Sequence, residues 1–203
     1  PAEFMASVLS NMGGFYSAAV YIWECKRLGL KILLPSINKS NYEYTGRKDE
    51  IQIGLMAIKN LSRNSIQNIL DERKKDGEYH SLANFLIRTK LAFEETSILV
   101  KCGAMGCLKK TRPELLRLLD IYIHKRKILN ESYNDLFLHE TFQMEDEVRT
   151  NINFSVEEIC KAEYETFDYM VTRHPLYFYR SETEKPEVVK AKDLEKYRGK
   201  NVK

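Results

Sequence analysis

The chain of 203 residues is long enough for one or two folded domains, and its hydrophobic content of 43% suffices for a buried core. A net charge of +3 with 30% charged residues describes a mixed surface, so any affinity for nucleic acid must come from local patches. No apolar run approaches the roughly 20 residues that cross a membrane, and the four scattered cysteines without a signal peptide favour a reducing cytoplasm.

Two helices are predicted at the start of the chain. Residues 1–12 carry one apolar side and end at Gly13-Gly14. A second helix is expected over residues 15–28, with Gly29 as its C-terminal cap. The apolar side of the first helix consists of Phe4, Met5, Val8, Leu9 and Met12.

A small amount of β structure follows. Residues 31–34 form a short apolar run that Pro35 ends, which is typical of a strand. Residues 42–44 and 50–53 are compatible with a hairpin that turns at Thr45-Gly46.

Residues 54–73 have the outline of a helix-hairpin-helix, in which two short helices flank a polar loop. Apolar positions recur at helical spacing before residue 59 and again from Ile66. Main-chain N–H groups of such a hairpin can point at a phosphate, and nearby cations add attraction that does not depend on base sequence. A plain helical pair is the alternative, because Asn60-Leu61-Ser62 stands where the hairpin usually carries Gly-x-Gly.

A second unit of the same kind is predicted further along. Ser81 is expected to cap a helix that runs through Arg88, and a helix over residues 93–101 ends at Gly103. Pro113 then opens another helix. The candidate DNA-binding residues of the two turns are Lys59, Asn60, Ser62, Arg63, Asn64, Gly103, Lys109, Lys110 and Arg112.

The rest of the chain changes in character. Residues 130–153 are polar and acidic, which favours a linker, with Asp135-Leu136-Phe137-Leu138 as an apolar island. Ser155 and Glu158 predict a capping box for a helix that Pro175 stops at His174. The tail after Ser181 is rich in Lys and Glu and is typical of a solvated linker. The two ends of the chain suggest a piece of a longer protein.

The cysteines at positions 25, 102, 107 and 160 do not have the spacing of a metal site. Two well-separated Cys-x2-Cys or His pairs, which a zinc site requires, are missing. Buried or half-buried thiols are therefore expected.

Several segments carry motifs that occur together in one protein family. Residues 1–6 have the sequence P-A-E-F-M-A, residues 24–30 fit E-x-x-R-x-G-(I/L), and residues 34–38 are close to P-P-D-(I/V)-N, with departures at Leu34 and Ser36. Residues 54–59 match G-(L/I)-x-A-I-K. Residues 100–105 are close to L-I-x-x-G-A-F, and His174-Pro175-Leu176 to S-G-H-P-L.

In this order the motifs resemble the alpha subunit of bacterial DNA polymerase III, the family C replicative polymerases, over nearly the whole chain. The resemblance implies a mainly α fold with a tandem helix-hairpin-helix domain and a short β element. It divides the chain into the end of the fingers helices (1–30), the DNA-binding domain (31–127), a linker (128–154), a helix (155–180) and the lead-in to an oligonucleotide-binding (OB) domain (181–203).

The resemblance also implies partners and chemistry. Duplex DNA, the sliding clamp and other replicase subunits are the expected partners, and no membrane is. The metal-binding carboxylates of the polymerase family lie in a palm domain before this segment, so Mg²⁺ is expected there and no cofactor within these residues. We expect the fragment alone to be inactive in DNA synthesis.

A clamp-binding peptide is implied in the linker. The family carries Q-L-(S/D)-L-F between the hairpin region and the OB fold, and Asp135, Leu136 and Phe137 match it, whereas Tyr133 and Asn134 depart from it. Packing into a core is the alternative for these residues. For the whole chain, the alternative is a non-catalytic helix-hairpin-helix DNA-binding or scaffold protein.

Overall fold

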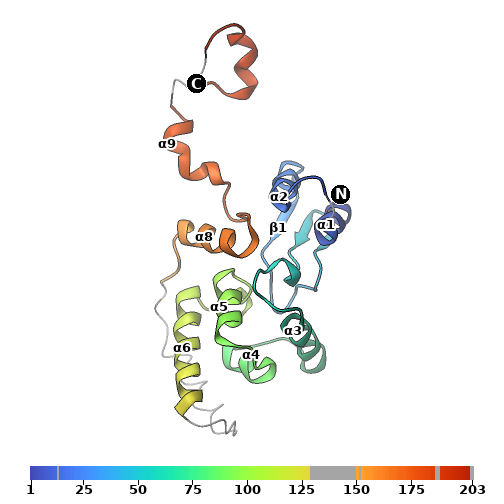
Figure 1. The fold of residues 1–203 in the computed structure, drawn as a ribbon, viewed down its shortest axis with the longest axis vertical. Helices are drawn as coiled ribbons and strands as arrows, with labels where there is room; N and C mark the ends of the chain where they lie inside the picture. The colour runs from blue at the N-terminus through green and yellow to red at the C-terminus, as the bar shows by residue number, and fades with distance from the viewer. Residues whose placement is uncertain (13, 129–149, 151, 186–187, 202–203) are drawn as a thin grey trace. The chain divides into compact units, whose positions relative to one another are not determined.

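Short helices surround one three-stranded sheet in the first part of the chain (Figure 1). The structure, a computed structural model, describes all residues except 13, 129–149, 151, 186–187 and 202–203. Residues Pro1–Val171 form a first compact unit and Thr172–Lys203 a second. The mainly α fold with a short β element is therefore as predicted.

The first two helices are α1 (Ala2–Asn11) and α2 (Ala18–Arg27). The buried stripe of α1 consists of Ala2, Met5, Ala6 and Leu9, so small residues let this helix lie close to the sheet. Two residues of the predicted apolar side, Phe4 and Met12, lie outside this stripe, with exposed fractions of 71% and 73%. Met12 has already left the helix, with a φ of 48°.

The sheet has the strand order β1-β3-β2, from β1 (Lys31–Leu33), β2 (Thr45–Arg47) and β3 (Glu50–Gln52). β1 pairs with β3 in parallel, and β2 pairs with β3 antiparallel. The predicted hairpin therefore turns at Lys48-Asp49, whereas Gly46 lies within β2 opposite Ile51. Gly46 is needed there because a Cβ would lie 2.2 Å from the carbonyl oxygen of Ala2.

The helical hairpins follow the sheet. The first consists of the 3-10 turn η1 (Leu55–Ala57) and α3 (Arg63–Asp76), so its first helix is a single turn. Helix α4 (Leu82–Thr89) begins at Ser81, whose hydroxyl accepts the N–H of Asn84 as predicted. The second hairpin consists of α5 (Phe93–Lys101), the 3-10 turn η2 (Gly106–Leu108) and α6 (Arg112–Ile128). Helices α5 and α6 pack on each other, as do α3 and α4.

Helix α8 (Val156–Phe167) closes the first unit. Ser155 and Glu158 form the predicted capping box. The helix ends at Phe167 and not at His174, because Asp168 adopts a left-handed backbone with a φ of 65°. The reversal turns Tyr169 and Val171 into the core, where both are buried.

The second unit is made of short helical turns: η3 (Pro175–Tyr179), α9 (Arg180–Thr183) and η4 (Ala191–Tyr197). His174 caps η3, since its Nδ1 accepts the N–H of Leu176 at 3.1 Å. None of the helices in the described ranges is long and apolar enough to span a membrane.

The close approach of α1 and β2 generates a stability prediction. Gly46→Ala should destabilise the fold by about 2–3 kcal/mol, because the new methyl group overlaps the main chain of Ala2 and Glu3. Urea unfolding followed by circular dichroism measures the change. Gly106→Ala is the matched control, since a Cβ at Gly106 meets nothing within 4 Å, and its effect should stay within about 1 kcal/mol. Equal losses in the two variants would contradict this account of Gly46.

Candidate nucleic-acid interface

The first hairpin, residues 58–62, has a left-handed turn, although Asn60-Leu61-Ser62 stands where Gly-x-Gly is usual. Asn60 takes a left-handed conformation with a φ of 60°, which asparagine tolerates better than most residues. Leu61 is buried, and Ser62 caps α3 by accepting the N–H of Ser65 at 3.0 Å. The side chains of Asn60, Ser62, Arg63 and Asn64 are exposed.

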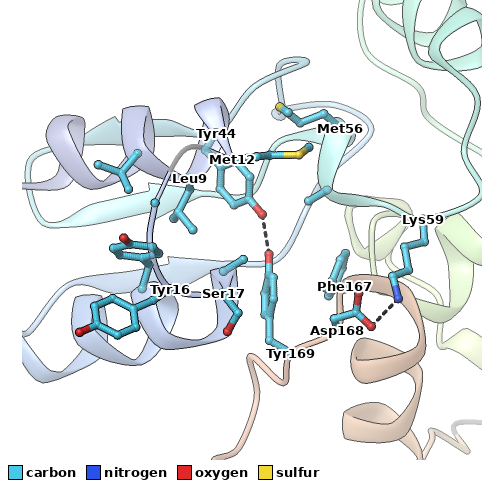
Figure 2. A pocket seen from close by; sticks show the side chains of 15 residues that line it. Leu9, Met12, Tyr16, Ser17, Tyr44, Met56, Lys59, Phe167, Asp168 and Tyr169 are labelled. Atoms are coloured by element: carbon cyan, nitrogen blue, oxygen red, sulfur yellow. Dashed lines mark hydrogen bonds and ion pairs between the residues drawn. The ribbon is translucent and has the colours of Figure 1, made fainter.

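Lys59 is held by the end of α8. Its main-chain N–H donates to the carbonyl of Thr166 at 3.0 Å, and its ammonium group forms an ion pair with Asp168 (Figure 2). Beside this pair, the hydroxyls of Tyr44 and Tyr169 lie 2.7 Å apart. Lys59 therefore joins the hairpin to α8.

A cavity of about 400 Å³ opens at this junction. Its walls come from α1, the start of α2, the first hairpin and the end of α8, and they are mostly apolar and aromatic (Figure 2). Lys59 and Asp168 are its charged lining residues. The ion pair thus lies where four segments of the first unit meet.

Two other residues of the first hairpin region have partners within the chain. The guanidinium of Arg63 lies over the ring of Tyr42, 5.5 Å from its centre. The main-chain N–H of Ser62 donates to the carboxylate of Glu95 at 3.0 Å. Glu95 was not predicted as part of the site.

The second turn, residues 102–111, contains two left-handed residues. Gly103 has a φ of 88° and Lys109 a φ of 56°. Lys109 is exposed and Lys110 is half-buried. The N–H of Thr111 donates to the carboxylate of Glu114 at 2.9 Å, which closes the N-terminus of α6.

Arg112 is half-buried and lies against the second turn. Its guanidinium covers Gly103, where a Cβ would lie 2.5 Å from it, and its Nε is buried with no hydrogen-bond partner among the described residues. Burial lowers the pKa of Arg112, and the negative charge of Glu163 in α8 opposes this shift.

Glu163 is fully buried and has a second cation nearby. It accepts the N–H of Val171 at 2.7 Å, and Lys26 of α2 donates to the carbonyl of the same residue. Burial lowers the pKa of Lys26, again against the attraction of Glu163. Lys26 also lies 4.3 Å from the centre of the Trp23 ring.

The structure thus separates the predicted DNA-binding residues into two groups. Lys59, which is also exposed, pairs with Asp168 directly after α8, and Arg112 is attracted by Glu163 in the middle of this helix. Asn60, Ser62, Arg63, Asn64 and Lys109 are exposed, and Lys110 is partly so. The sequence did carry a signal for Glu163, because it shares a helical face with Cys160 and Phe167.

The thiols are buried or half-buried, as predicted. Cys25, Cys102 and Cys160 are buried and Cys107 is half-buried, and none is in a disulfide. Burial raises the pKa of Cys25 to about 11 and that of Cys102 to about 12. Within the part of the chain that the structure describes, no group of three or more acidic, His or Cys residues is arranged to hold a metal ion. The predicted clamp-binding residues Tyr133, Asp135, Leu136 and Phe137 lie outside the described residues.

Two helical hairpins in one core, each with left-handed backbone in its turn, define a tandem helix-hairpin-helix protein. A family model described as a helix-hairpin-helix motif matches residues 29–115. The chain is 31% identical over 191 residues to the DNA polymerase III subunit alpha of Treponema pallidum, and 31% identical over 210 residues to that of Campylobacter jejuni. It is 29% identical over 196 residues to that of Buchnera aphidicola from Acyrthosiphon pisum.

These matches cover 89%, 96% and 91% of this chain. The chain belongs to the family of the bacterial DNA polymerase III alpha subunits. It spans 16–17% of the length of these relatives, so the comparison concerns one segment of them.

The buried charge of Glu163 generates a second stability prediction. Glu163→Ala should lower the free energy of unfolding by about 3–5 kcal/mol, because it removes a fully buried carboxylate and leaves the half-buried Lys26 and Arg112 without their counter-charge. Glu165→Ala, an exposed position of the same helix, is the control and should change stability by about 0.5 kcal/mol or less. Chemical unfolding of both variants compares them, and a similar small loss in each would show that Glu163 does not hold the unit together.

Proposed function

We propose that this chain is a duplex-DNA-binding segment of a DNA-directed DNA polymerase. The observation that carries the proposal is the tandem helix-hairpin-helix, whose two turns present cationic and polar side chains to solvent in a chain of the DNA polymerase III alpha family. In a polymerase such a domain holds duplex DNA by its backbone. The cytoplasm is the expected compartment.

The proposed contacts are to phosphates. Arg63, Lys109 and Lys110 supply positive charge at the two turns, Asn60, Ser62 and Asn64 supply polar side chains at the first, and Gly103 gives the second its left-handed backbone. Phosphate contacts position a protein on DNA without reading the bases, so binding should be independent of sequence and should weaken steeply with salt. We assign Lys59 and Arg112 a supporting role, because each interacts with an acidic residue of α8.

We propose that the longer protein polymerises DNA together with other replicase subunits, and that these 203 residues do not. Nucleotidyl transfer requires carboxylates that hold two metal ions, which the family has in its palm domain. Nucleotide incorporation by the purified fragment on a primed template, measured with and without a chelator of Mg²⁺, should be undetectable. Incorporation that the chelator abolishes would refute this expectation.

A further proposal concerns the sliding clamp. The match of Asp135-Leu136-Phe137 in residue type, and its position between the hairpins and α8, support a clamp-binding peptide there. A Leu-Phe pair suits an apolar pocket on a partner, which is a common mode of peptide recognition.

The DNA-binding proposal predicts a change in salt dependence. Lys109→Ala combined with Lys110→Ala should weaken duplex binding roughly tenfold and reduce the slope of log K against log[salt] by about two. Fluorescence anisotropy of a labelled duplex at several salt concentrations measures both quantities. Lys39→Ala combined with Lys48→Ala removes the same charge at exposed positions outside both turns and is the control. Equal effects of the two double variants would show that only net charge matters.

The clamp proposal predicts loss of a complex. Leu136→Ala combined with Phe137→Ala should abolish binding of the chain to a sliding clamp, because the apolar anchor of the peptide is removed. Surface plasmon resonance with an immobilised clamp measures it. Leu138→Ala, next to the motif, should bind nearly as well as the unaltered chain, and binding that survives the double substitution would refute the proposal.

A further inference from the structure

The N-terminus of α3 holds an acidic side chain from another helix. Glu95, in the first turn of α5, accepts the main-chain N–H of Ser62 at 3.0 Å and the hydroxyl of Ser65 at 2.7 and 2.8 Å. The N-terminus of a helix carries partial positive charge and favours anions. A carboxylate of this chain is therefore bound where a DNA phosphate would approach α3.

Other main-chain donors of the first hairpin also have acceptors within the chain. The N–H of Lys59 donates to Thr166, and that of Leu61 donates to Ile58 at 3.4 Å. Asn60 meanwhile keeps the left-handed backbone of the hairpin. Main-chain donors of the second turn are engaged in the same way, since the N–H groups of Gly103 and Lys109 donate to the carbonyls of Val100 and Gly106 at 3.1 and 3.3 Å. The two turns therefore do not differ in their main-chain donors, and the difference between them lies in their acidic groups.

We propose that Glu95 makes the first hairpin a weak phosphate site, so that duplex DNA is held mainly by the second turn. A phosphate that approaches the exposed Ser62, Arg63 and Asn64 would lie beside the half-buried carboxylate of Glu95, and the two negative charges repel each other. Arg63 lies over Tyr42 instead of pairing with that carboxylate.

The two turns differ in the exposure of their acidic groups. Glu114 at the second turn is 5% exposed and accepts the N–H groups of Thr111 and Thr150, so its charge is covered. The exposed Lys109 precedes Glu114 in the same turn region. The second turn therefore presents Lys109 to solvent beside a covered carboxylate, whereas the first presents Arg63 beside the half-buried carboxylate of Glu95. The inference rests on the proposed duplex binding and assigns each turn its share.

Removal of one charge tests the inference. Glu95→Gln keeps the size of the side chain and its ability to accept a hydrogen bond but removes the negative charge. Duplex affinity, measured by anisotropy with a labelled duplex of about 20 base pairs, should rise roughly three- to tenfold. Glu94→Gln is the matched control, because it makes the same change of net charge at the adjacent, exposed position. Its effect should stay below about twofold, since screening weakens exposed charges at a distance.

A second measurement locates the contact in the unaltered chain. In ¹H–¹⁵N spectra, added duplex should shift the amide signals of Gly103 and Lys109 and leave those of Ser62 and Asn64 nearly unchanged. In the Glu95→Gln variant all four signals should shift. The spectra of the unaltered chain test the inference even if the variant does not fold.

The outcomes separate the inference from the function on which it rests. An unchanged affinity of Glu95→Gln, an equal gain in Glu94→Gln, or shifts of Ser62 as large as those of Gly103 in the unaltered chain would each overturn the role of Glu95 and leave duplex binding intact. If no variant binds duplex and no amide signal moves, the proposed function itself fails.

Discussion

The burial of Glu163 is the constraint on which the rest of the first unit depends. A carboxylate taken out of water destabilises a fold by several kcal/mol unless cations and hydrogen bonds compensate it. Here the compensation comes from Lys26 of α2, from Arg112 at the start of α6 and from the N–H of Val171. The N-terminal helices, the second hairpin and α8 must therefore pack in one arrangement, because no single one of these segments supplies all the partners of Glu163.

This arrangement gives the cations near the two turns different surroundings. Arg112 and Lys59 have the spacing of DNA-binding residues, yet both interact with α8, one with its buried middle and one with its end. The ion pair of Lys59 and Asp168 is exposed and adds little stability by itself. The end of α8 is also held by the hydrogen bond from Lys59 to Thr166 and by the hydrogen bond between the hydroxyls of Tyr44 and Tyr169. Lys59 and Arg112 thus have acidic partners within the chain, although Lys59 also remains exposed.

Features that depend on neighbouring residues were predicted correctly from the sequence, whereas features that depend on contacts between distant segments were not. Ser81 caps its helix and the capping box of Ser155 forms as expected, because each involves residues three apart, and Ser62 caps α3 in the same local way without having been predicted to. The errors at Gly46, Met12 and Asp168 share a different origin. Gly46 lies in a strand that α1 approaches too closely for a side chain, and α8 ends early because Asp168 reverses the chain and turns Tyr169 towards Tyr44. Likewise, the candidate cations were identified from their positions in the two turns. Glu95 and Glu163, the acidic residues near them, lie in distant segments of the chain and were not identified.

The helix-hairpin-helix backbone of this chain therefore does not by itself determine whether a turn can bind phosphate. The first hairpin reaches the required backbone without glycine, since Asn60 adopts a φ of 60°, while Gly103 serves the second turn with a φ of 88°. Both turns therefore contain left-handed backbone. The two turns differ in the charged groups beside them. At the first turn, these groups are Glu95 from α5 and Asp168 after α8. Backbone shape alone therefore does not decide how a turn meets an anion, because the charged side chains packed beside the turn come from other segments of the chain.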